Sequence, residues 1–422
     1  MARVAFYFDD HGFSQLDLSS PCEGNNGVGG TQYCFLMTAD ALVKHTQHEV
    51  VFYHYHENRF PPGVQERIVS TWQEMLELAQ KDGCDVFIFK AEGASDMVKA
   101  LRDTQLKCVA WAHNYLYAKE LEELTSSPAI RRVVFVGREQ YDRYIDHDVI
   151  GKSVFIYNMF DGERFPLRRQ PETPAVTYTG SLIHAKGFHL LARVWKDVLR
   201  EVPEAQLYVI GSGRLYDRSA AVGPLQVASG RYEAEFAGDL MENGRLLPSV
   251  HFLGTMGLEK LEIYQRTSVG VMNPSGRTET FGLSAVEMGA CGIPGVTKAA
   301  NGLFDTELSG RTGYLVRSER QLRQKIVRLL RDRAGSQRMC VEAKAFVTAA
   351  FSPQRLVGQW DQLIADVLAD APCAYRRPAA HFTNNAKWAR MVIRALRRCG
   401  IPFPPLINLE CAAAGLLRRK GS

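Results

Sequence analysis

The segment Asn273-Pro-Ser-Gly-Arg-Thr-Glu-Thr-Phe-Gly-Leu-Ser-Ala-Val-Glu287 carries the side chains best suited to hold a charged ligand. It follows an apolar strand predicted to end at Met272, and ligands of parallel-sheet proteins bind beyond the carboxyl ends of the strands. A helix is predicted to begin directly after Glu279, so its free amides and the positive end of its dipole could bind a diphosphate. The residues of this first turn are Thr280, Phe281, Gly282 and Leu283.

The two glutamates of this segment are eight residues apart, which corresponds to about 12 Å along a helix. Carboxylate pairs of glycoside hydrolases lie roughly 5 to 9.5 Å apart. Glu279 and Glu287 are therefore better placed to hold two ends of one ligand. The alternative is that Glu279 is an ordinary acid in the first turn of the helix and Glu287 a solvated surface residue, and the spacing alone does not decide between the two.

Short β-rich apolar runs alternate with helical periodicity from the start of the chain, a pattern typical of parallel sheets with crossover helices. The first part of the chain predicts helices at residues 31–45 and 64–80. The strands expected there cover residues 4–8, 50–53, 85–89, 108–112, 132–136 and 153–157. Together these elements predict one doubly wound α/β domain.

Residues 166–174 hold three prolines among polar residues, and we interpret them as an interdomain linker because neither a helix nor a central strand accommodates them. A second doubly wound series follows. Its predicted strands are 175–179, 206–210 and 268–272, and its predicted helices contain Trp195 and Glu287. Residues 214–248 show no clear periodicity and are expected to form a long surface loop.

Length and composition indicate a globular protein of two domains. The chain has 422 residues, of which 46% are hydrophobic and 23% charged, so it has ample apolar surface to bury. No apolar run reaches the roughly 18 residues of a membrane-spanning helix. Residues 1–10 predict a strand rather than a signal peptide, so a cytoplasmic location is expected. Nine scattered cysteines without a Cys-x-x-Cys pair argue against a disulfide framework and a zinc site.

The segment from Glu279 to Glu287, with Phe-Gly-Leu after the first glutamate, resembles the Glu-x7-Glu signature of glycosyltransferase family 4. Other segments resemble that family in the same order, over roughly residues 1–368. They are Gly29-Gly-Thr-Gln32, Ile156-Tyr-Asn-Met-Phe-Asp-Gly-Glu-Arg-Phe165, Thr179-Gly-Ser-Leu-Ile-His-Ala-Lys-Gly187, Ile210-Gly-Ser-Gly213 and Val250-His-Phe-Leu-Gly254. Each is a weak signal alone, whereas the ordered set is a strong one.

The resemblance implies an α/β protein of GT-B fold, with two Rossmann-like domains facing across a cleft. We expect an acceptor-side domain at residues 1–165, the linker at 166–174, a nucleotide-sugar domain at 175–368 and a basic tail at 369–422. Such an enzyme transfers a sugar from a nucleotide-diphosphate donor with retention of anomeric configuration and without a metal. The leaving phosphate is thought to help deprotonate the acceptor, so the protein contributes orientation and charge stabilisation.

The resemblance also implies roles for individual residues. Glu279 would bind hydroxyls of the transferred sugar, Glu287 those of the ribose, and Lys186 the donor diphosphate. His113, at the end of an apolar strand, would lie against the donor sugar. The glycine loop and the donor-side turns would bring backbone amides to the phosphates, the acceptor or the base. The residues expected there are Gly29, Gly30, Gly180, Ser181, Gly213 and Leu253.

Two features complicate the assignment of cations in the site. The family usually has an arginine where this chain has Ser181, so one phosphate-binding cation is missing or is supplied elsewhere, with Arg277 and Lys298 as candidates. Asp146-His-Asp148 superficially matches the Asp-x-Asp metal motif of other glycosyltransferases. We interpret it as a solvated loop and predict no metal and no other cofactor.

The acceptor expected from this resemblance is a glycan or a lipid-linked glycan, as in bacterial-type surface polysaccharide or lipopolysaccharide synthesis. A GT-B phosphorylase or epimerase remains the nearest enzymatic alternative, and a non-catalytic partner subunit is the alternative from another class. A nicotinamide dehydrogenase is excluded, because neither Gly27-Val-Gly29 nor Gly211-Ser-Gly213 continues as Gly-x-Gly-x-x-Gly.

The net charge of +5 is concentrated at the end of the chain, where residues 371–422 hold ten Lys and Arg residues and one acid. Residues 384–398 predict an amphipathic helix with Trp388, Met391 and Val392 on its apolar stripe. The basic residues around that stripe are Lys387, Arg390, Arg394, Arg397 and Arg398, followed later by Arg418-Arg-Lys420. This pattern predicts contact with an anionic membrane surface. A helix packed across the two domains, or a disordered basic end that touches nucleic acid non-specifically, are the alternatives.

Overall fold

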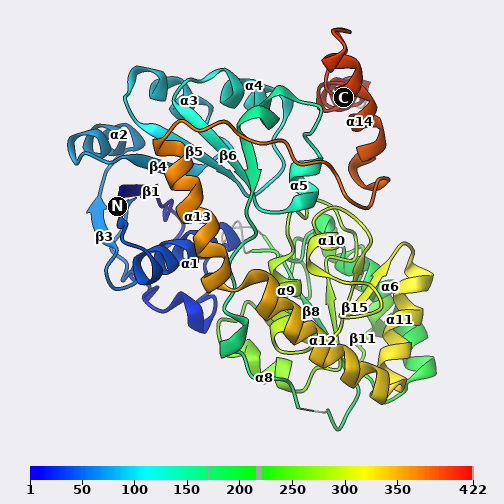
Figure 1. Ribbon diagram of the computed structural model, residues 1–422. Coiled ribbons are helices and arrows are strands. Elements are labelled where there is room, and N and C mark those ends of the chain that lie inside the picture. Colours follow the sequence, from blue (N-terminus) through cyan, green and yellow to red (C-terminus); the bar gives the residue numbers. More distant parts are fainter. Residues whose placement is uncertain (170, 215–220, 421–422) are drawn as a thin grey trace. The chain divides into compact units, whose positions relative to one another are not determined.

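The chain forms two compact α/β units, each built on its own parallel sheet (Figure 1). The computed structural model describes residues 1–169, 171–214 and 221–420, with the backbone alone for residues 417–420. Unit 1 comprises residues 1–21, 28–159 and 353–422, and unit 2 comprises residues 22–27 and 160–352. The predicted fold class of two doubly wound Rossmann-like domains is confirmed.

Unit 1 contains a seven-stranded sheet in the order β3-β2-β1-β4-β5-β6-β7, with every neighbouring pair parallel. Its central strands are almost wholly buried because helices cover both faces, as their continuous apolar sequences require. The strands are β1 Arg3–Tyr7, β2 Glu49–His54, β3 Gln65–Ile68, β4 Val86–Lys90, β5 Lys107–Ala112, β6 Ile130–Phe135 and β7 Ser153–Phe155.

The helices of unit 1 differ from the prediction in one place. Residues 64–80 were predicted as one helix, but Gln65–Ile68 is the edge strand β3 and the helix α2 begins only at Trp72, where Thr71 caps it. The strand reads Gln-Glu-Arg-Ile, and three consecutive polar residues on an exposed edge give no period-2 pattern that would distinguish it from a helix. The helices are α1 Gly30–His45, α2 Trp72–Lys81, α3 Ser95–Ala100, α4 Ala118–Ser126, α5 Arg138–Asp142, α13 Pro353–Leu368, α14 Lys387–Arg398 and α15 Leu406–Lys420.

Unit 2 contains a six-stranded parallel sheet in the order β12-β9-β8-β13-β14-β15. Its strands are β8 Ala175–Thr179, β9 Gln206–Ile210, β12 Val250–Gly254, β13 Val269–Met272, β14 Gly295–Lys298 and β15 Gly313–Val316. Its helices are α6 Phe188–Glu201, α7 Gly230–Glu233, α8 Lys260–Gln265, α9 Leu283–Ala290, α10 Leu303–Thr306, α11 Glu319–Arg331 and α12 Arg333–Phe351.

The described part of the insertion at residues 214–248 is not the long surface loop that was predicted. Residues 215–220 lie outside the described part of the chain, but the remainder contains α7 and a small hairpin of β10 Met241–Glu242 with β11 Arg245–Leu246. Tyr232, Phe236 and Leu240 join the hydrophobic core of unit 2. The buried carboxylate of Glu233 organises the turn by accepting hydrogen bonds from three backbone amides, at 2.8 to 2.9 Å. The sequence of this insertion shows no clear periodicity because its helix and strands are only two to four residues long.

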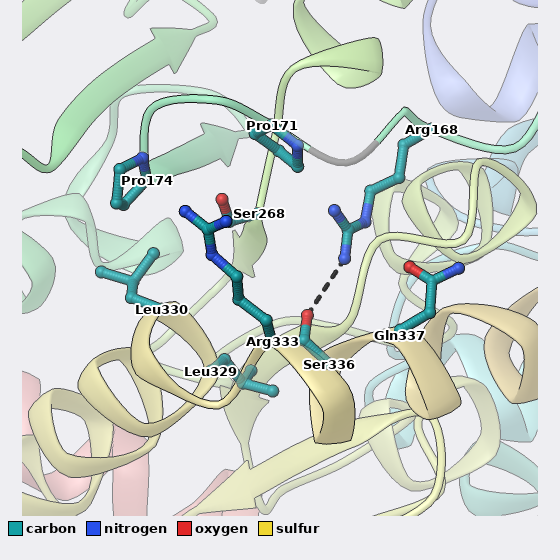
Figure 2. A pocket seen from close by; sticks show the side chains of 9 residues that line it. All are labelled: Arg168, Pro171, Pro174, Ser268, Leu329, Leu330, Arg333, Ser336 and Gln337. Atoms are coloured by element: carbon teal, nitrogen blue, oxygen red, sulfur yellow. Dashed lines mark hydrogen bonds between the residues drawn. The ribbon is translucent and has the colours of Figure 1, made fainter.

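The predicted linker at 166–174 falls within unit 2, although residue 170 lies outside the described chain. Figure 2 shows Arg168 reaching across a small pocket to the Ser336 hydroxyl, at 3.0 Å, with Pro171 and Pro174 lining the same pocket. Arg168 also donates to the carbonyl of Gly292 at 3.2 Å and is 8% exposed. The proline-rich segment is thus anchored to unit 2 rather than free.

The boundary predicted at residue 368 differs from the division of the chain into units. Helix α13, which was placed in the second domain, belongs to unit 1 and lies along α1 (Figure 1). Its apolar face is buried, with Trp360 set edge-on against Trp111 of β5 at 4.6 Å between ring centroids. Burial of this face contributes to the stability of the first domain rather than of the second.

The basic tail packs on unit 1 through ion pairs. Lys387, which is 1% exposed, contacts Glu139 at 2.6 Å and Asp142 at 2.8 Å. Arg390 is fully buried and contacts Asp146 at 3.3 Å. Arg397 binds the Asp148 carboxylate at 2.7 Å. The expected ring of exposed cations around α14 is therefore wrong for Lys387 and Arg390, because these side chains neutralise buried acids.

These pairs also correct the interpretation of Asp146-His-Asp148 as a solvated loop. Asp146 is 2% exposed and His147 4%, whereas only Asp148 is exposed. Asp146 binds Arg390 and accepts the backbone N–H of Leu406, at 2.6 Å, so it anchors both tail helices. A motif that resembles a metal site serves here to hold the end of the chain.

With Lys387 and Arg390 turned inward, the tail presents several apolar side chains to solvent. Trp388 is 61% exposed and Val392 54%. The other large apolar side chains exposed in this region are Phe382, Met391, Ile401, Phe403, Leu409 and Leu416. Among the described residues, no helix is long and apolar enough to cross a membrane.

Candidate active site

The strand order of unit 2 reverses between β8 and β13, and the loops that leave these two strands meet at the carboxyl edge of the sheet. Chain reversal at such a point opens the crevice in which doubly wound proteins bind ligands. The loop after β8 carries Lys186, and the loop after β13 carries Glu279. The Lys186 Nζ lies 2.8 Å from the Glu279 Oε2, so the structure brings these two predicted site residues together.

Asn273 completes this arrangement by donating its side-chain amide to the same Glu279 oxygen, at 2.9 Å. The backbones of the two loops also touch: a Cβ added to Gly187 would lie 2.6 Å from the Ser275 nitrogen, and Gly187 has a φ of 72°. Only glycine fits this position. Thr278 is held at a φ of 56°, an uncommon value for a β-branched residue, directly before Glu279. Such local strain is typical of functional loops.

The helix after this loop begins later than predicted. Thr280 and Phe281 do not begin it, because α9 starts at Leu283 and Gly282 caps it in a left-handed conformation at φ 91°. Thr280 and Phe281 are buried, and the Phe281 ring packs edge-on against Phe351 at 5.2 Å. Glu279 therefore lies in the loop, and the first amides of α9 remain the anion-binding end of the helix.

Glu287 is buried rather than solvated, which removes the surface interpretation of this residue. Its carboxylate contacts the Lys260 ammonium at 2.7 Å and accepts the Tyr264 hydroxyl hydrogen bond at 3.1 Å. The Tyr264 hydroxyl also lies 3.2 Å from Thr179, at the end of β8. Lys260 and Tyr264 were missed at the sequence level. The signal for them was a short helical run directly after the predicted base-side segment that ends at Gly254.

The remaining predicted residues of unit 2 divide into two groups. Gly180 and the buried Ser181 follow β8, and Leu253 lies in β12, near the carboxyl edge of the sheet. Gly213 has a structural role instead: its N–H donates to the Val227 carbonyl at 2.8 Å, and an added Cβ would lie 2.8 Å from the Ala228 Cα. The amide of Gly213 is thus occupied by the insertion rather than offered to a donor.

Of the two candidate cations for the missing arginine, Lys298 donates to the Arg317 carbonyl at 2.9 Å. Arg277 is exposed in the loop between Asn273 and Glu279. Which of the two cations replaces the missing arginine stays a prediction.

In unit 1, His113 follows β5 and packs against the rings of Trp111 and Phe35, at centroid distances of 4.5 and 5.7 Å. Burial lowers the pKa of His113 to about 3, so the imidazole is neutral at physiological pH. Gly29 and Gly30 begin α1, and Gln32 donates to the Asp9 carbonyl at 3.1 Å, which ties this turn to the end of β1. Their predicted contacts with the donor or acceptor stay predictions.

One group of described residues in unit 2 has the ligand types of a metal site. His184, His189 and Glu235 offer ligand atoms that lie within 4.8 Å of one another. In this structure His184 is paired with Glu235 at 2.8 Å, and His189 with the Tyr232 hydroxyl at 3.1 Å. The prediction of a metal-free reaction is not decided by this geometry.

Comparison with known proteins gives matches to glycosyltransferases. The model of the glycosyl transferases group 1 matches residues 159–346. The N-acetyl-alpha-D-glucosaminyl L-malate synthase of Bacillus anthracis is 23% identical over 354 residues, which cover 76% of this chain and 84% of that protein. The D-inositol 3-phosphate glycosyltransferase of Mycobacteroides abscessus is 28% identical over 60% of this chain and 53% of its own length. The match to the group 1 glycosyltransferases therefore covers residues 159–346, almost all of which lie in unit 2.

Solved structures support the same fold. A sucrose-phosphate synthase from Thermosynechococcus elongatus has a TM-score of 0.66 at 16% identity, covering 87% of this chain and 100% of its own. Anabaena Alr3699/HepE, solved in complex with UDP-glucose, has a TM-score of 0.63 at 17% identity with the same coverage. These likenesses confirm the GT-B fold, and the sequence matches are to glycosyltransferases.

The Lys186–Glu279 pair predicts that Lys186→Ala impairs binding of the nucleoside diphosphate as well as of the nucleotide sugar, because the ammonium would contact phosphate. A charge-assisted hydrogen bond contributes roughly 1.5 to 3 kcal/mol, so we expect a 10- to 150-fold loss for both ligands by calorimetry. Lys119→Ala, at a lysine whose side chain is 77% exposed, is the matched control. A loss confined to the nucleotide sugar would contradict the phosphate contact.

We predict that Glu287 binds the ribose in addition to its structural pair with Lys260, and one substitution can distinguish the two roles. Glu287→Gln keeps the shape but removes the charge paired with Lys260. We expect at least a tenfold loss of affinity for UDP and little loss for its 2′,3′-dideoxy analogue, because the analogue lacks the hydroxyls. An equal loss of affinity for the two nucleotides would mean that Glu287 only stabilises the fold. Leaving its buried partner Lys260 unpaired costs about 3–5 kcal/mol.

Proposed function

We propose that unit 2 binds the donor at the reversal between β8 and β13, with the diphosphate at Lys186 and the first amides of α9. Glu279 would bind hydroxyls of the transferred sugar, and Glu287 those of the ribose. The observation that carries this proposal is the Lys186–Glu279 pair of 2.8 Å, which joins a phosphate-binding cation to a hydroxyl-binding carboxylate from two separate loops. The acceptor would be a glycan or a lipid-linked glycan.

Each group in this site has a chemical task in the transfer. Lys186 and the α9 amides would stabilise the charge that develops on the leaving diphosphate. Glu279 would orient the sugar, since the hydrogen bond from Asn273 and the contact with Lys186 fix its carboxylate. The acceptor hydroxyl would pass its proton to the leaving phosphate on the same face of the sugar. No protein nucleophile is required in this scheme.

Donor turnover tests the proposal. We expect one sugar nucleotide of a panel to be hydrolysed slowly without acceptor, and we would begin with UDP-sugars because the similar Alr3699/HepE was solved with UDP-glucose. Activity should survive excess EDTA, since Lys186 and the helix amides take the part of a cation. Complete loss that a divalent ion restores would contradict the metal-free mechanism and direct attention to His184, His189 and Glu235.

The alternative functions give different results in the same assay. Release of sugar that depends on added phosphate would indicate a phosphorylase, and interconversion of sugar nucleotides an epimerase. If no donor in the panel binds or reacts, the non-catalytic partner subunit becomes the better interpretation.

We also propose that the exposed apolar side chains of the tail dock on a membrane surface, which suits a lipid-linked acceptor. The support is Trp388, Met391 and Val392 on one face of α14, with Arg398 exposed beside them. Because Lys387 and Arg390 are paired inside unit 1, insertion of apolar side chains would contribute more than the attraction of cations to anionic lipid. A fully buried apolar side chain contributes roughly 1.5 to 3 kcal/mol.

Flotation with phosphatidylcholine vesicles, with and without phosphatidylglycerol, tests this surface. The full-length protein should float, and the variant W388A/M391A/V392A should lose at least tenfold in vesicle affinity. The control I68A/V341A/L368A removes three exposed apolar side chains elsewhere and should float like the wild type. Truncation of the tail is unsuitable, because it would strip Glu139 and Asp146 of their buried partners. Equal flotation of the two variants would contradict the docking surface.

A further inference from the structure

The insertion at residues 214–248 meets the turn that carries Lys186 at a cluster of side chains that are common metal ligands. His184 lies in this turn, His189 lies in the first turn of α6, and Glu235 follows α7 of the insertion. Each of the three offers one ligand atom, and these atoms lie within 4.8 Å of one another. The cluster therefore joins the insertion to the donor side of unit 2.

The residue types of this cluster select among metal ions. Two imidazoles and one carboxylate form a common set of three protein ligands for Zn²⁺, with a water molecule in the fourth position. Imidazole nitrogen suits zinc and its neighbours in the first transition row, whereas Mg²⁺, Ca²⁺ and Mn²⁺ prefer oxygen ligands. The cluster thus favours Zn²⁺ over the ions that a diphosphate usually carries.

His189 is the fixed member of the cluster, with 5% of its surface exposed. Its Nδ1 lies 3.1 Å from the Tyr232 hydroxyl oxygen, which also accepts the backbone N–H of His189 at 3.2 Å. Histidines that bind metals usually donate one ring N–H to such a partner, which leaves the lone pair of the other nitrogen for the metal. Burial lowers the pKa of His189, and His184 and Arg193 lower it further, so the ring is neutral and can act as a ligand.

His184 and Glu235 are the adjustable members of the cluster. The His184 Nδ1 lies 2.8 Å from the Glu235 Oε2, and the two side chains are 52% and 33% exposed. The His184 ring stacks on that of His189, with 4.6 Å between centroids. Ligand atoms of tetrahedral zinc lie about 3.4 Å apart, so the largest separation of 4.8 Å has to shorten by roughly 1.4 Å. Rotation of the exposed His184 ring out of its stack can supply this movement.

The cations beside the cluster are already paired with acids. Arg193 acts on the cluster from α6, and its guanidinium lies 3.2 Å from the Glu319 carboxylate. The Lys186 ammonium lies 2.8 Å from Glu279. Glu235 supplies the negative charge within the cluster itself. A divalent ion bound there is therefore attracted by one carboxylate and meets cations whose charge is largely neutralised, which limits the repulsion.

We propose that the cluster of His184, His189 and Glu235 binds Zn²⁺ and thereby fastens the insertion to the turn of Lys186. The ion is structural: the Lys186 ammonium faces Glu279, and the transfer itself proceeds without a metal. Because the ion orders the turn, it also strengthens the binding of a nucleoside diphosphate by Lys186. This last consequence rests on the proposed function, whereas the metal site does not.

Metal titration of the full-length protein tests the site. Loss of a partner beyond the ligands costs 10- to 100-fold in metal affinity, so loss of two ligands should cost at least about 100-fold. We expect that loss for Zn²⁺ in His184→Ala combined with Glu235→Gln, together with loss of the visible bands of tetrahedral Co²⁺. The control His45→Ala combined with Glu77→Gln changes an exposed histidine and an exposed acid of unit 1 and should bind like the wild type. Equal Zn²⁺ affinity in the two variants would overturn the proposal.

Hydrogen exchange of the wild-type protein locates the ion without any substitution. Zn²⁺ should slow exchange at least threefold in residues 183–190 and 229–237, because the ion links these two segments. Helix α8, in the same unit, should exchange as before. Mg²⁺ at the same concentration should protect neither segment. Protection that is absent from both segments, or that Mg²⁺ gives equally, would contradict a zinc site here.

Nucleotide binding separates this proposal from the proposed function. By calorimetry, after free Zn²⁺ has been removed, UDP should bind at least threefold more tightly to the zinc-loaded protein than to the EDTA-treated protein. The difference should vanish in the variant that lacks His184 and Glu235. Unchanged UDP affinity in the zinc-loaded protein would overturn the effect on the Lys186 turn. Failure to bind any nucleotide would instead refute the proposed function, while the Zn²⁺ titration still decides the metal site.

Discussion

Both units depend on one constraint of parallel sheets: the loops that leave adjacent strands at a reversal of strand order must diverge to opposite faces. The divergence opens a crevice at the carboxyl edge, between β1 and β4 in unit 1 and between β8 and β13 in unit 2. Neither crevice needs a specialised fold, since each arises from the order in which the strands are laid down. Charged pairs lie beside both reversals, Lys186 with Glu279 in unit 2 and Lys99 with Asp96 in unit 1.

Ion pairs of low exposure hold the charged groups of unit 2 in fixed positions. Glu287 and Lys260 are 6% and 7% exposed, so each charge would be costly to bury without the other. The pair lies on α9 and α8, whereas Lys186 and Glu279 come from two loops. Preorganised charges of this kind need little rearrangement when charge develops on a bound ligand, which is the main source of catalysis by electrostatics. The tail uses the same device for a structural purpose at Lys387 and Arg390.

The fold could be predicted, and the loops that carry Lys186 and Glu279 could be located, because their signals are local. Apolar strands such as β5 and the turn before Glu279 are visible within a few residues, and the motif order carried the rest. Three features depend on contacts between distant segments and were not accessible. Gly213 has the sequence context of a phosphate-loop glycine but packs against Ala228. Asp146 matches a metal-binding motif but binds Arg390. Helix α13 was predicted to end the second domain but packs on α1. Periodicity reports which face is apolar and not which partner covers it.

The return of residues 353–422 to unit 1 has a consequence for the order of folding during synthesis. The segment 160–352 of unit 2 is continuous and is complete before α13 is made. The sheet of unit 1 is made first, but until α13 follows it lacks the core side chains Trp360, Leu363 and Ile364. It also lacks the cations of the tail that neutralise Asp142 and Asp146. Domains usually fold as units, with the N-terminal one first. Here the N-terminal domain is the last to be finished, so the face that α13 covers stays open while residues 160–352 are made.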